Sequence, residues 1–397
     1  MLLYLYVSLL AGRFSISRLN EGGDSSSFDL RYLLASGGVL LVFALSADSN
    51  LVAARRSRMI GWAGFALWSA WMALSAMWAP SGADVVSGIQ DIFFLLVLVS
   101  LAWFVATYLD LDFLDSIWTW AVVTGLIYFI LAIASGPDLQ GRYSAPGGGP
   151  NTFVRIMIIA SIAALYLAVV KNVNLVLLTL PVFSIGAILS GSRGGILAAA
   201  IIAVVLVPIA AVKLGPAKIA AAGGILGFAL ILASRWRDGY IIDFVQERFI
   251  RQTLIEKYAS GRDVITEQAW GMFQSSPWFG VGLDGFSALQ VGSHDYGYAH
   301  NLVLSTLAEG GIVGGLLLLV AVGSLVGASI RSASVSQSAL FLLLAGVFYF
   351  TTSFFSGDYY DSRFIWFFFG LATLSIHHDS SERMGDSEEL SEASLLR

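Results

Sequence analysis

The sequence predicts an all-α, polytopic membrane protein. Of its 397 residues, 57% are hydrophobic and only 12% are charged, whereas soluble domains carry about 25% charged residues. The apolar residues occur in runs close to the roughly 20 residues that a helix needs to span a bilayer. Aromatic residues make up 13% of the chain, which suits the interfacial belts of membrane helices. The absence of cysteine excludes disulfide bonds, thiolate catalysis and cysteine-ligated metals.

About twelve apolar segments are expected to cross the membrane. They lie at about residues 1–12, 31–47, 59–79, 89–108, 116–134, 152–170, 173–191, 195–212, 217–234, 303–330, 338–355 and 364–376. This pattern divides the chain into nine spans over 1–234, a helical water-facing loop over 235–300, three spans over 301–376 and a disordered tail over 377–397. The first segment is short and has no basic residue ahead of it. It is expected to serve as its own insertion signal, uncleaved, or to be re-entrant.

Basic residues in alternate short connections predict the orientation. When the spans are counted along the chain, the following basic residues fall on the same side of the membrane, that is, on the same parity: Arg55, Arg56, Arg58, Lys171, Lys213, Lys218 and Arg331. The positive-inside rule places this parity and both termini in the cytoplasm. The outer connections are then 79–88, 135–151, 191–195, 235–300 and 356–363. Arg13, Arg18 and Arg31 fall on the outer parity and count against this orientation.

The outer loop 235–300 has a helical pattern. Residues 240–258 alternate apolar and charged side chains as in an amphipathic helix lying on a membrane surface. A second helix is expected to start after Ser260 and to end before Pro277, and Gly280, Gly282 and Gly285 then predict a tight turn.

Four arginines lie on the outer side, where the positive-inside rule expects few cations: Arg142, Arg193, Arg262 and Arg363. Only four of the chain's 22 basic residues are lysines, and the planar guanidinium suits phosphate and carboxylate. The alternative is a genome that favours arginine codons. We therefore expect an anionic ligand on the outer face.

Two of these arginines start helices. Arg193 lies between Ser192 and Gly194 at the junction of two spans, where glycines allow backbone amides to approach an anion at a helix N-terminus. Arg262 opens the second loop helix, and two guanidinium groups can hold a diphosphate without a metal. The structural alternatives are a glycine-rich hairpin and a surface arginine that pairs with Asp263 or Glu267.

A third motif is His300-Asn301, which precedes an apolar helix. A histidine at the mouth of a span can accept a proton from a sugar hydroxyl, and an interfacial structural role is the alternative. Glu309 lies nine residues further along, on another side of the helix. It is therefore expected to anchor a neighbouring element and not to orient His300.

The fourth motif comprises Asp358, Asp361 and Arg363 before the last span. These side chains either recognise sugar hydroxyls or lock adjacent loops through ion pairs. Arg155 lies one turn inside the sixth span, where an uncompensated charge is costly, so it is expected to face a cavity or an acidic partner.

In this order, the motifs resemble the O-antigen ligase and polymerase family of GT-C membrane glycosyltransferases over roughly residues 141–363. The most specific pieces are Ser192-Arg193-Gly194-Gly195 and His300-Asn301 with Glu309. The resemblance implies that Arg193 and Arg262 hold the diphosphate of an undecaprenyl-diphosphate-linked oligosaccharide donor, and that His300 acts on the glycan acceptor. Substrate-binding roles are predicted for Arg142, Asn151, Arg155, Ser192, Gly194, Asn301, Glu309, Asp358, Asp361 and Arg363.

The resemblance implies an inverting glycosyltransferase that needs no metal or other cofactor and faces the periplasm from a bacterial inner membrane. The compact outer loop and the Gly-Asp-x-x-Asp-x-Arg ending favour a polymerase of O-antigen or exopolysaccharide, with the lipid bilayer, a chain-length regulator and a flippase as partners and no nucleic acid. The alternatives are a ligase that delivers glycan to lipid A core or to protein, a transporter of lipid-linked sugars, and a structural assembly protein. The absence of an inverted repeat counts against the transporter.

Overall fold

The computed structural model describes residues 6, 9–10, 30–46, 60–108, 111–144, 148–235, 240–255, 261–291 and 297–374. This part of the chain is helical, with no strand beyond an isolated bridge between Pro137 and Tyr143. The all-α prediction is confirmed for it. The main helices are α2 (Leu30–Ser46), α4 (Ile60–Leu74), α5 (Val85–Tyr108), α6 (Leu111–Ser135), α7 (Pro150–Val169), α8 (Leu180–Leu189), α9 (Arg193–Leu214), α10 (Pro216–Arg235), α11 (Tyr240–Val245), α12 (Arg262–Ser275), α13 (Gly285–Leu289), α14 (Leu302–Ala333), α15 (Gln337–Thr352) and α16 (Arg363–Leu374).

Five of the described helices are long and apolar enough to cross a membrane, in place of the predicted twelve. They are Val85–Ala106 of α5, Ser116–Ser135 of α6, and the whole of α7, α9 and α14. Several other predicted spans form shorter helices: α4 gives way to the 3-10 turn η2 (Ser75–Trp78), and α16 has only 12 residues. Twelve residues of α-helix reach about 18 Å, short of the roughly 30 Å hydrocarbon core. Most of the predicted first span and the whole tail over 377–397 lie outside the described residues.

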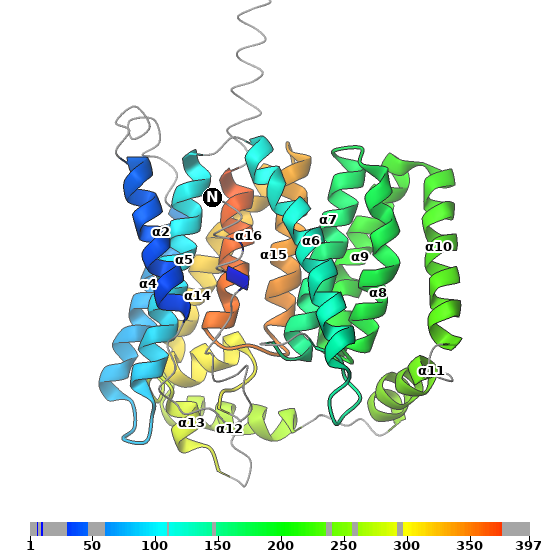
Figure 1. The fold of residues 1–397 in the computed structure, drawn as a ribbon. Helices are drawn as coiled ribbons and strands as arrows, with labels where there is room; N and C mark the ends of the chain where they lie inside the picture. The colour runs from blue at the N-terminus through cyan, green and yellow to red at the C-terminus, as the bar shows by residue number, and fades with distance from the viewer. Residues whose placement is uncertain are drawn as a thin grey trace, which may run out of the picture.

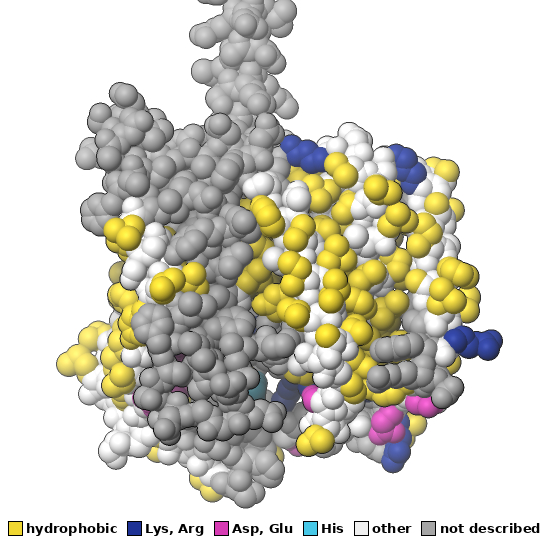
Figure 2. Space-filling model, viewed as in Figure 1, with side chains coloured by type: hydrophobic (Ala, Val, Ile, Leu, Met, Phe, Trp, Pro, Cys, Tyr) yellow, Lys and Arg dark blue, Asp and Glu magenta, His cyan; other side chains and the backbone are white. Residues whose placement is uncertain are grey.

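The long helices lie side by side and share one apolar core (Figure 1). Helix α7 packs against α6, α8, α9 and α15, while α14 packs against α4, α15 and α16. Large aromatic rings fill the contact between α4 and α16, where Trp366 lies 4.6 Å from Phe65 and 5.3 Å from Trp68 between ring centroids. Side chains on the outside of the bundle form an apolar belt with basic groups near its upper and lower edges (Figure 2), which suits a lipid environment.

The predicted outer connections meet at one end of the bundle, the lower end in Figure 1. Trp78 donates to the Phe279 carbonyl at 3.2 Å, the Tyr143 amide donates to Leu189 at 3.0 Å, and the Leu302 amide donates to Ser353 at 3.0 Å. The predicted parity of these connections is therefore confirmed. Arg31 also lies at this end, where Asp91 pairs with it at 2.6 Å. This buried ion pair explains how a cation is accommodated on the outer parity.

The helices predicted in the outer loop are present. Residues 240–255 form α11 followed by a π-helical segment, η5 (Gln246–Ile255), and α12 ends two residues before Pro277. Gly280 and Gly282 adopt φ of +72° and +94°, which confirms the predicted turn.

Helix α14 is broken at Gly311, nine residues after its first residue, where φ is +65°. The segment 277–282 completes the interrupted hydrogen bonds. The amides of Val281 and Gly282 donate to Ala308 and Glu309 at 2.9 and 3.0 Å, and the Ile312 amide donates to Pro277 at 2.8 Å. A break inside an apolar helix is stable only when its backbone groups find such partners.

Candidate functional site

The tight turn between α8 and α9 positions Arg193. Gly191 has a φ of +60°, and the Ser192 hydroxyl then caps α9 by accepting the Gly195 amide at 3.4 Å. A side chain on Gly194 would overlap Phe355, and one on Gly195 would overlap Val154. The glycines after Arg193 therefore allow close helix packing, and the expected approach of an anion to their backbone stays a prediction.

Two further arginines donate hydrogen bonds to the same turn. The Nε atom of Arg142 donates to the Ser190 carbonyl at 2.9 Å, and the Nε atom of Arg248 donates to the Gly191 carbonyl at 3.3 Å. Arg248 comes from η5 and also donates to Gln252 at 2.8 Å. It was not among the predicted site residues, because its spacing in the amphipathic segment is that of an ordinary solvated face.

Arg262 completes a group of four guanidiniums. Burial, then the charge of Arg193, lowers the pKa of Arg262, with a further contribution from Arg248. Burial, then the charge of Arg248, lowers the pKa of Arg142 to about 10. Among the described residues Arg262 forms no ion pair with Asp263 or Glu267, so the surface-pair alternative is not what the structure shows. Positive charges this close repel one another, and an anion between them relieves that repulsion.

His300 lies beside Arg262 with its own backbone in the left-handed region, at φ +53°. Its ring is half-buried and lies 4.1 Å from the Tyr298 ring between centroids. Burial, then the charge of Arg262, lowers the pKa of His300 to about 4. The imidazole is therefore neutral at pH 7 and has a nitrogen lone pair that can accept a hydroxyl proton.

Asn301 is the N-cap of α14, with its Oδ1 accepting the Leu304 amide at 3.1 Å. The predicted substrate-binding side chain is thus engaged in starting the helix that carries Glu309. It fixes the chain direction directly after His300.

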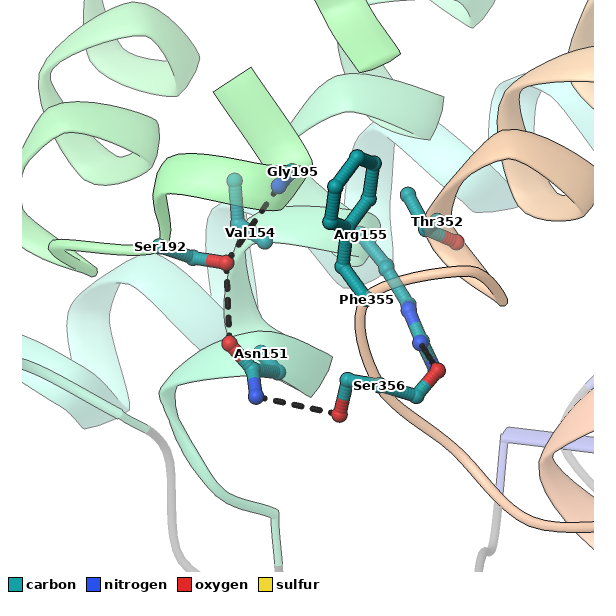
Figure 3. Close-up of a pocket in the computed structure, with 8 residues that line it drawn as sticks. All are labelled: Asn151, Val154, Arg155, Ser192, Gly195, Thr352, Phe355 and Ser356. Carbon is teal, nitrogen blue, oxygen red and sulfur yellow. Dashed lines mark hydrogen bonds between the residues drawn. The ribbon is translucent and has the colours of Figure 1, made fainter. Parts of the chain in front are cut away.

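Asn151 joins three elements around a small pocket (Figure 3). Its Oδ1 accepts the Ser192 hydroxyl at 2.9 Å and an Nη2 of Arg142 at 3.4 Å, and its Nδ2 donates to the Ser356 hydroxyl at 3.0 Å. The amide therefore ties α7 to the cap of α9 and to the loop before α16. This position predicts a role in holding Arg142 and Arg193 in place.

Arg155 lines the same pocket from α7, as Figure 3 shows. Its Nη2 donates to the Ser356 carbonyl at 2.5 Å. The expectation that this buried cation faces a cavity is confirmed.

Glu309 lies at the break in α14, is only 5% exposed, and anchors two neighbouring elements as predicted. Its carboxylate accepts the Phe286 amide at 3.2 Å, at the start of α13, and the Tyr359 hydroxyl at 2.7 Å. Burial and the Glu309 charge raise the pKa of Tyr359 well above its ordinary value, so the hydroxyl remains a donor.

The segment 357–363 favours loop locking over sugar recognition. Arg363 is 4% exposed and donates to the Leu9 carbonyl at 2.6 Å and to the Tyr360 carbonyl at 2.9 Å. It also pairs with Asp361 at 3.4 Å. Asp358 accepts the Asp361 amide at 3.0 Å and starts the short turn η6 (Tyr360–Ser362). Arg363 is thus engaged by backbone carbonyls and by Asp361, and Asp361 in turn acts electrostatically on His300.

Figure 2 shows an opening low on this face, beside which basic and His side chains are visible. The four arginines of the site come from the α6–α7 connection, α9, η5 and α12, so no single stretch of sequence holds the site. Fixed guanidiniums and a neutral imidazole form an arrangement that can stabilise a departing diphosphate while accepting a proton.

Comparison with sequence models of protein families gives a match to part of the chain. The sequence model of the family described as O-antigen ligase matches residues 175–319, which include Arg193, Arg248, Arg262 and His300. No curated protein matches the chain. The family match confirms the predicted resemblance to the O-antigen ligase and polymerase family, and with it a role in glycosyl transfer at a membrane.

Proposed function

We propose that the chain is a polymerase of bacterial surface polysaccharide at the periplasmic face of the inner membrane. A hydroxyl of one lipid-linked repeat unit attacks the anomeric carbon of an undecaprenyl-diphosphate-linked glycan. The bond from that carbon to the diphosphate oxygen breaks with inversion, and undecaprenyl diphosphate leaves with the bonding electrons. The hydroxyl proton passes to His300 and then to solvent.

The observation that carries the proposal is a group of four guanidiniums, from Arg142, Arg193, Arg248 and Arg262, in which Arg142 and Arg248 bind the turn directly before Arg193. Within this group Arg262 is the neighbour of His300, and burial together with the Arg262 charge lowers the pKa of His300 to about 4. Negative charge grows on the diphosphate as the anomeric bond breaks. Fixed cations stabilise this charge without reorganising, which is the largest source of catalysis in many enzymes. In the proposed reaction they take the part that a metal ion has in other phosphate-leaving reactions.

Binding of the diphosphate and the basicity of His300 are linked through Arg262. In the free protein its charge holds the pKa of His300 low. A bound diphosphate offsets that charge, so the pKa of His300 rises when the donor binds. The imidazole then becomes a stronger base only when a donor is in place.

The test uses purified protein in nanodiscs with lipid-linked repeat units and no other acceptor. We expect a ladder of glycan lengths. Arg193→Gln and His300→Gln should lower kcat by about 100-fold, because each removes a group that acts on the reacting atoms or the leaving group. Arg251→Gln is the matched control, since Arg251 is exposed on η5 and pairs with Glu247 at 3.2 Å.

Other outcomes contradict the proposal in distinct ways. Transfer that begins only after lipid A core or a protein acceptor is added identifies a ligase. Movement of lipid-linked sugar across vesicles that Arg193→Ala abolishes, without any transfer reaction, identifies a transporter. Unchanged glycan length in Arg193→Ala, Arg262→Ala and His300→Ala cells identifies an assembly protein.

A further inference from the structure

The four guanidiniums fall into two pairs by their places in the fold: the first pair binds carbonyls of the 190–193 turn, and the second pair belongs to the first residues of α9 and α12. Arg142 and Arg248 donate to the consecutive carbonyls of Ser190 and Gly191, at 2.9 and 3.3 Å. Arg193 follows the turn as the first residue of α9. Arg262 begins α12, on the side of Tyr298 and His300.

The electrostatic contributions follow the same division. Among charged neighbours, Arg248 has the largest effect on Arg142, and Arg193 has the largest effect on Arg262. Two guanidiniums held side by side offer the parallel donors that phosphate oxygens accept.

The first pair has an apolar neighbour that suits a lipid. Tyr240 and Phe244 stack at 6.1 Å between ring centroids, and Phe249 lies 6.5 Å from Phe244. The Tyr240 hydroxyl donates to the Gly141 carbonyl at 2.6 Å, directly before Arg142. Phe244 is 8% exposed and packs against the turn at Gly191, while Tyr240 and Phe249 are half-buried. Half-buried aromatic rings beside fixed cations suit a molecule with an anionic head and an apolar tail.

A single lipid diphosphate, substituted at both ends, carries fewer negative charges than the four guanidiniums carry positive ones. A polymerase binds two such molecules, because its acceptor is itself a lipid-linked repeat unit. We propose that Arg142 and Arg248 form a second diphosphate site for the acceptor, while Arg193 and Arg262 hold the donor beside His300. This inference rests on the proposed polymerase function.

Titration calorimetry with inorganic pyrophosphate tests the proposal, with the full chain in phosphatidylcholine nanodiscs. The expected result is two binding sites. Arg142→Gln or Arg248→Gln should weaken one site by about tenfold or more and leave the other, because each variant removes charge-assisted hydrogen bonds from one pair only. Arg193→Gln or Arg262→Gln should weaken the other site. The site that persists in each variant shows that the protein is folded, and Arg251→Gln should retain both.

The remaining outcomes separate this inference from the proposed function. A single site that any of the four variants weakens overturns the second site and leaves the proposed donor site standing. No pyrophosphate binding overturns both. A membrane lipid headgroup is the alternative to the acceptor as the source of a phosphate at the Arg142–Arg248 site. If the Arg142–Arg248 site is lost in phosphatidylglycerol nanodiscs and binds inorganic phosphate as tightly as pyrophosphate, the site belongs to a headgroup and the acceptor assignment is wrong.

Discussion

His300 links proton transfer to anion binding through the positive charge of Arg262. Burial and Arg262 both disfavour the protonated ring, and its pKa is lowered to about 4. Histidine NMR should therefore show a resonance that titrates near pH 4 and that disappears in His300→Gln. Arg262→Gln should raise this pKa because it removes the second cause, and inorganic pyrophosphate should raise it in the parent protein. A pKa that responds to neither change would place His300 away from the diphosphate.

The same shift sets the pH dependence of transfer. A base works only in its unprotonated form, so kcat/KM, which reports the free enzyme, should fall as the pH drops through about 4, not through the ordinary 6.5. The limb in kcat, which reports the donor complex, should lie at higher pH, because the bound diphosphate raises the pKa. Rate profiles over pH 3.5–8 check both limbs, with Arg251→Gln as the control. Coincident limbs would show that donor binding does not change the charge around His300.

At this scale the sequence predicted residues that act through local patterns. Arg193 and Arg262 begin helices next to glycines, and His300 precedes an apolar helix, so their special positions are visible in the chain itself. Arg248 was missed because its contact with Gly191, 57 residues away, arises only when η5 docks on the α8–α9 turn. Gly194 and Asn301 fit a ligand-binding pattern in the sequence. In the structure, the small size of Gly194 allows Phe355 to pack closely, and the Asn301 side chain caps α14.

The break in α14 is the feature that positions Glu309 and the 277–282 segment. Gly280 approaches the Glu309 backbone so closely that a Cβ would overlap it, and its φ is +72°. Gly280→Ala should therefore lower the free energy of unfolding by about 3 kcal/mol or more, from overlap and backbone strain together. Gly271→Ala is the matched control, because this glycine lies within α12 with open space around it. It should stabilise the protein by up to about 1 kcal/mol. Denaturant unfolding in detergent, followed by tryptophan fluorescence, measures both.

Equal effects of the two substitutions would show that the 277–282 segment does not dock in the break. The sequence predicted the turn at Gly280 and Gly282 from glycine spacing alone. It did not predict that this turn would enter α14, because the apolar run continues through Gly311 without a proline. The break is defined by partners some 30 residues earlier, the carbonyls of Pro277 and Trp278, which accept the amides of Ile312 and Val313.

Across the whole molecule, hydropathy predicted the helical class and the grouping of the outer connections, because both follow from burying apolar runs between polar turns. It did not predict the number of helices able to span a bilayer. Helix length depends on where packing ends each helix, as in α16, whose 12 residues are almost entirely buried. Composition also carries no information about which arginines meet across the bundle. The convergence of the site is a property of the assembled fold.

The absence of cysteine from the chain gives a direct test of orientation. Leu139 is fully exposed in the α6–α7 connection at the site end, and Ser334 is exposed at the end of α14 beyond Arg331, so Leu139→Cys and Ser334→Cys place one accessible thiol at each end of the bundle. If the arginine site faces the periplasm, a membrane-impermeant maleimide should label the cysteine at 139 in intact spheroplasts. The cysteine at 334 should react only after permeabilisation, because the positive-inside rule places the Arg331 end in the cytoplasm. The reverse pattern would direct the guanidiniums toward the cytoplasm, where a lipid-linked glycan already moved to the outer leaflet does not reach them.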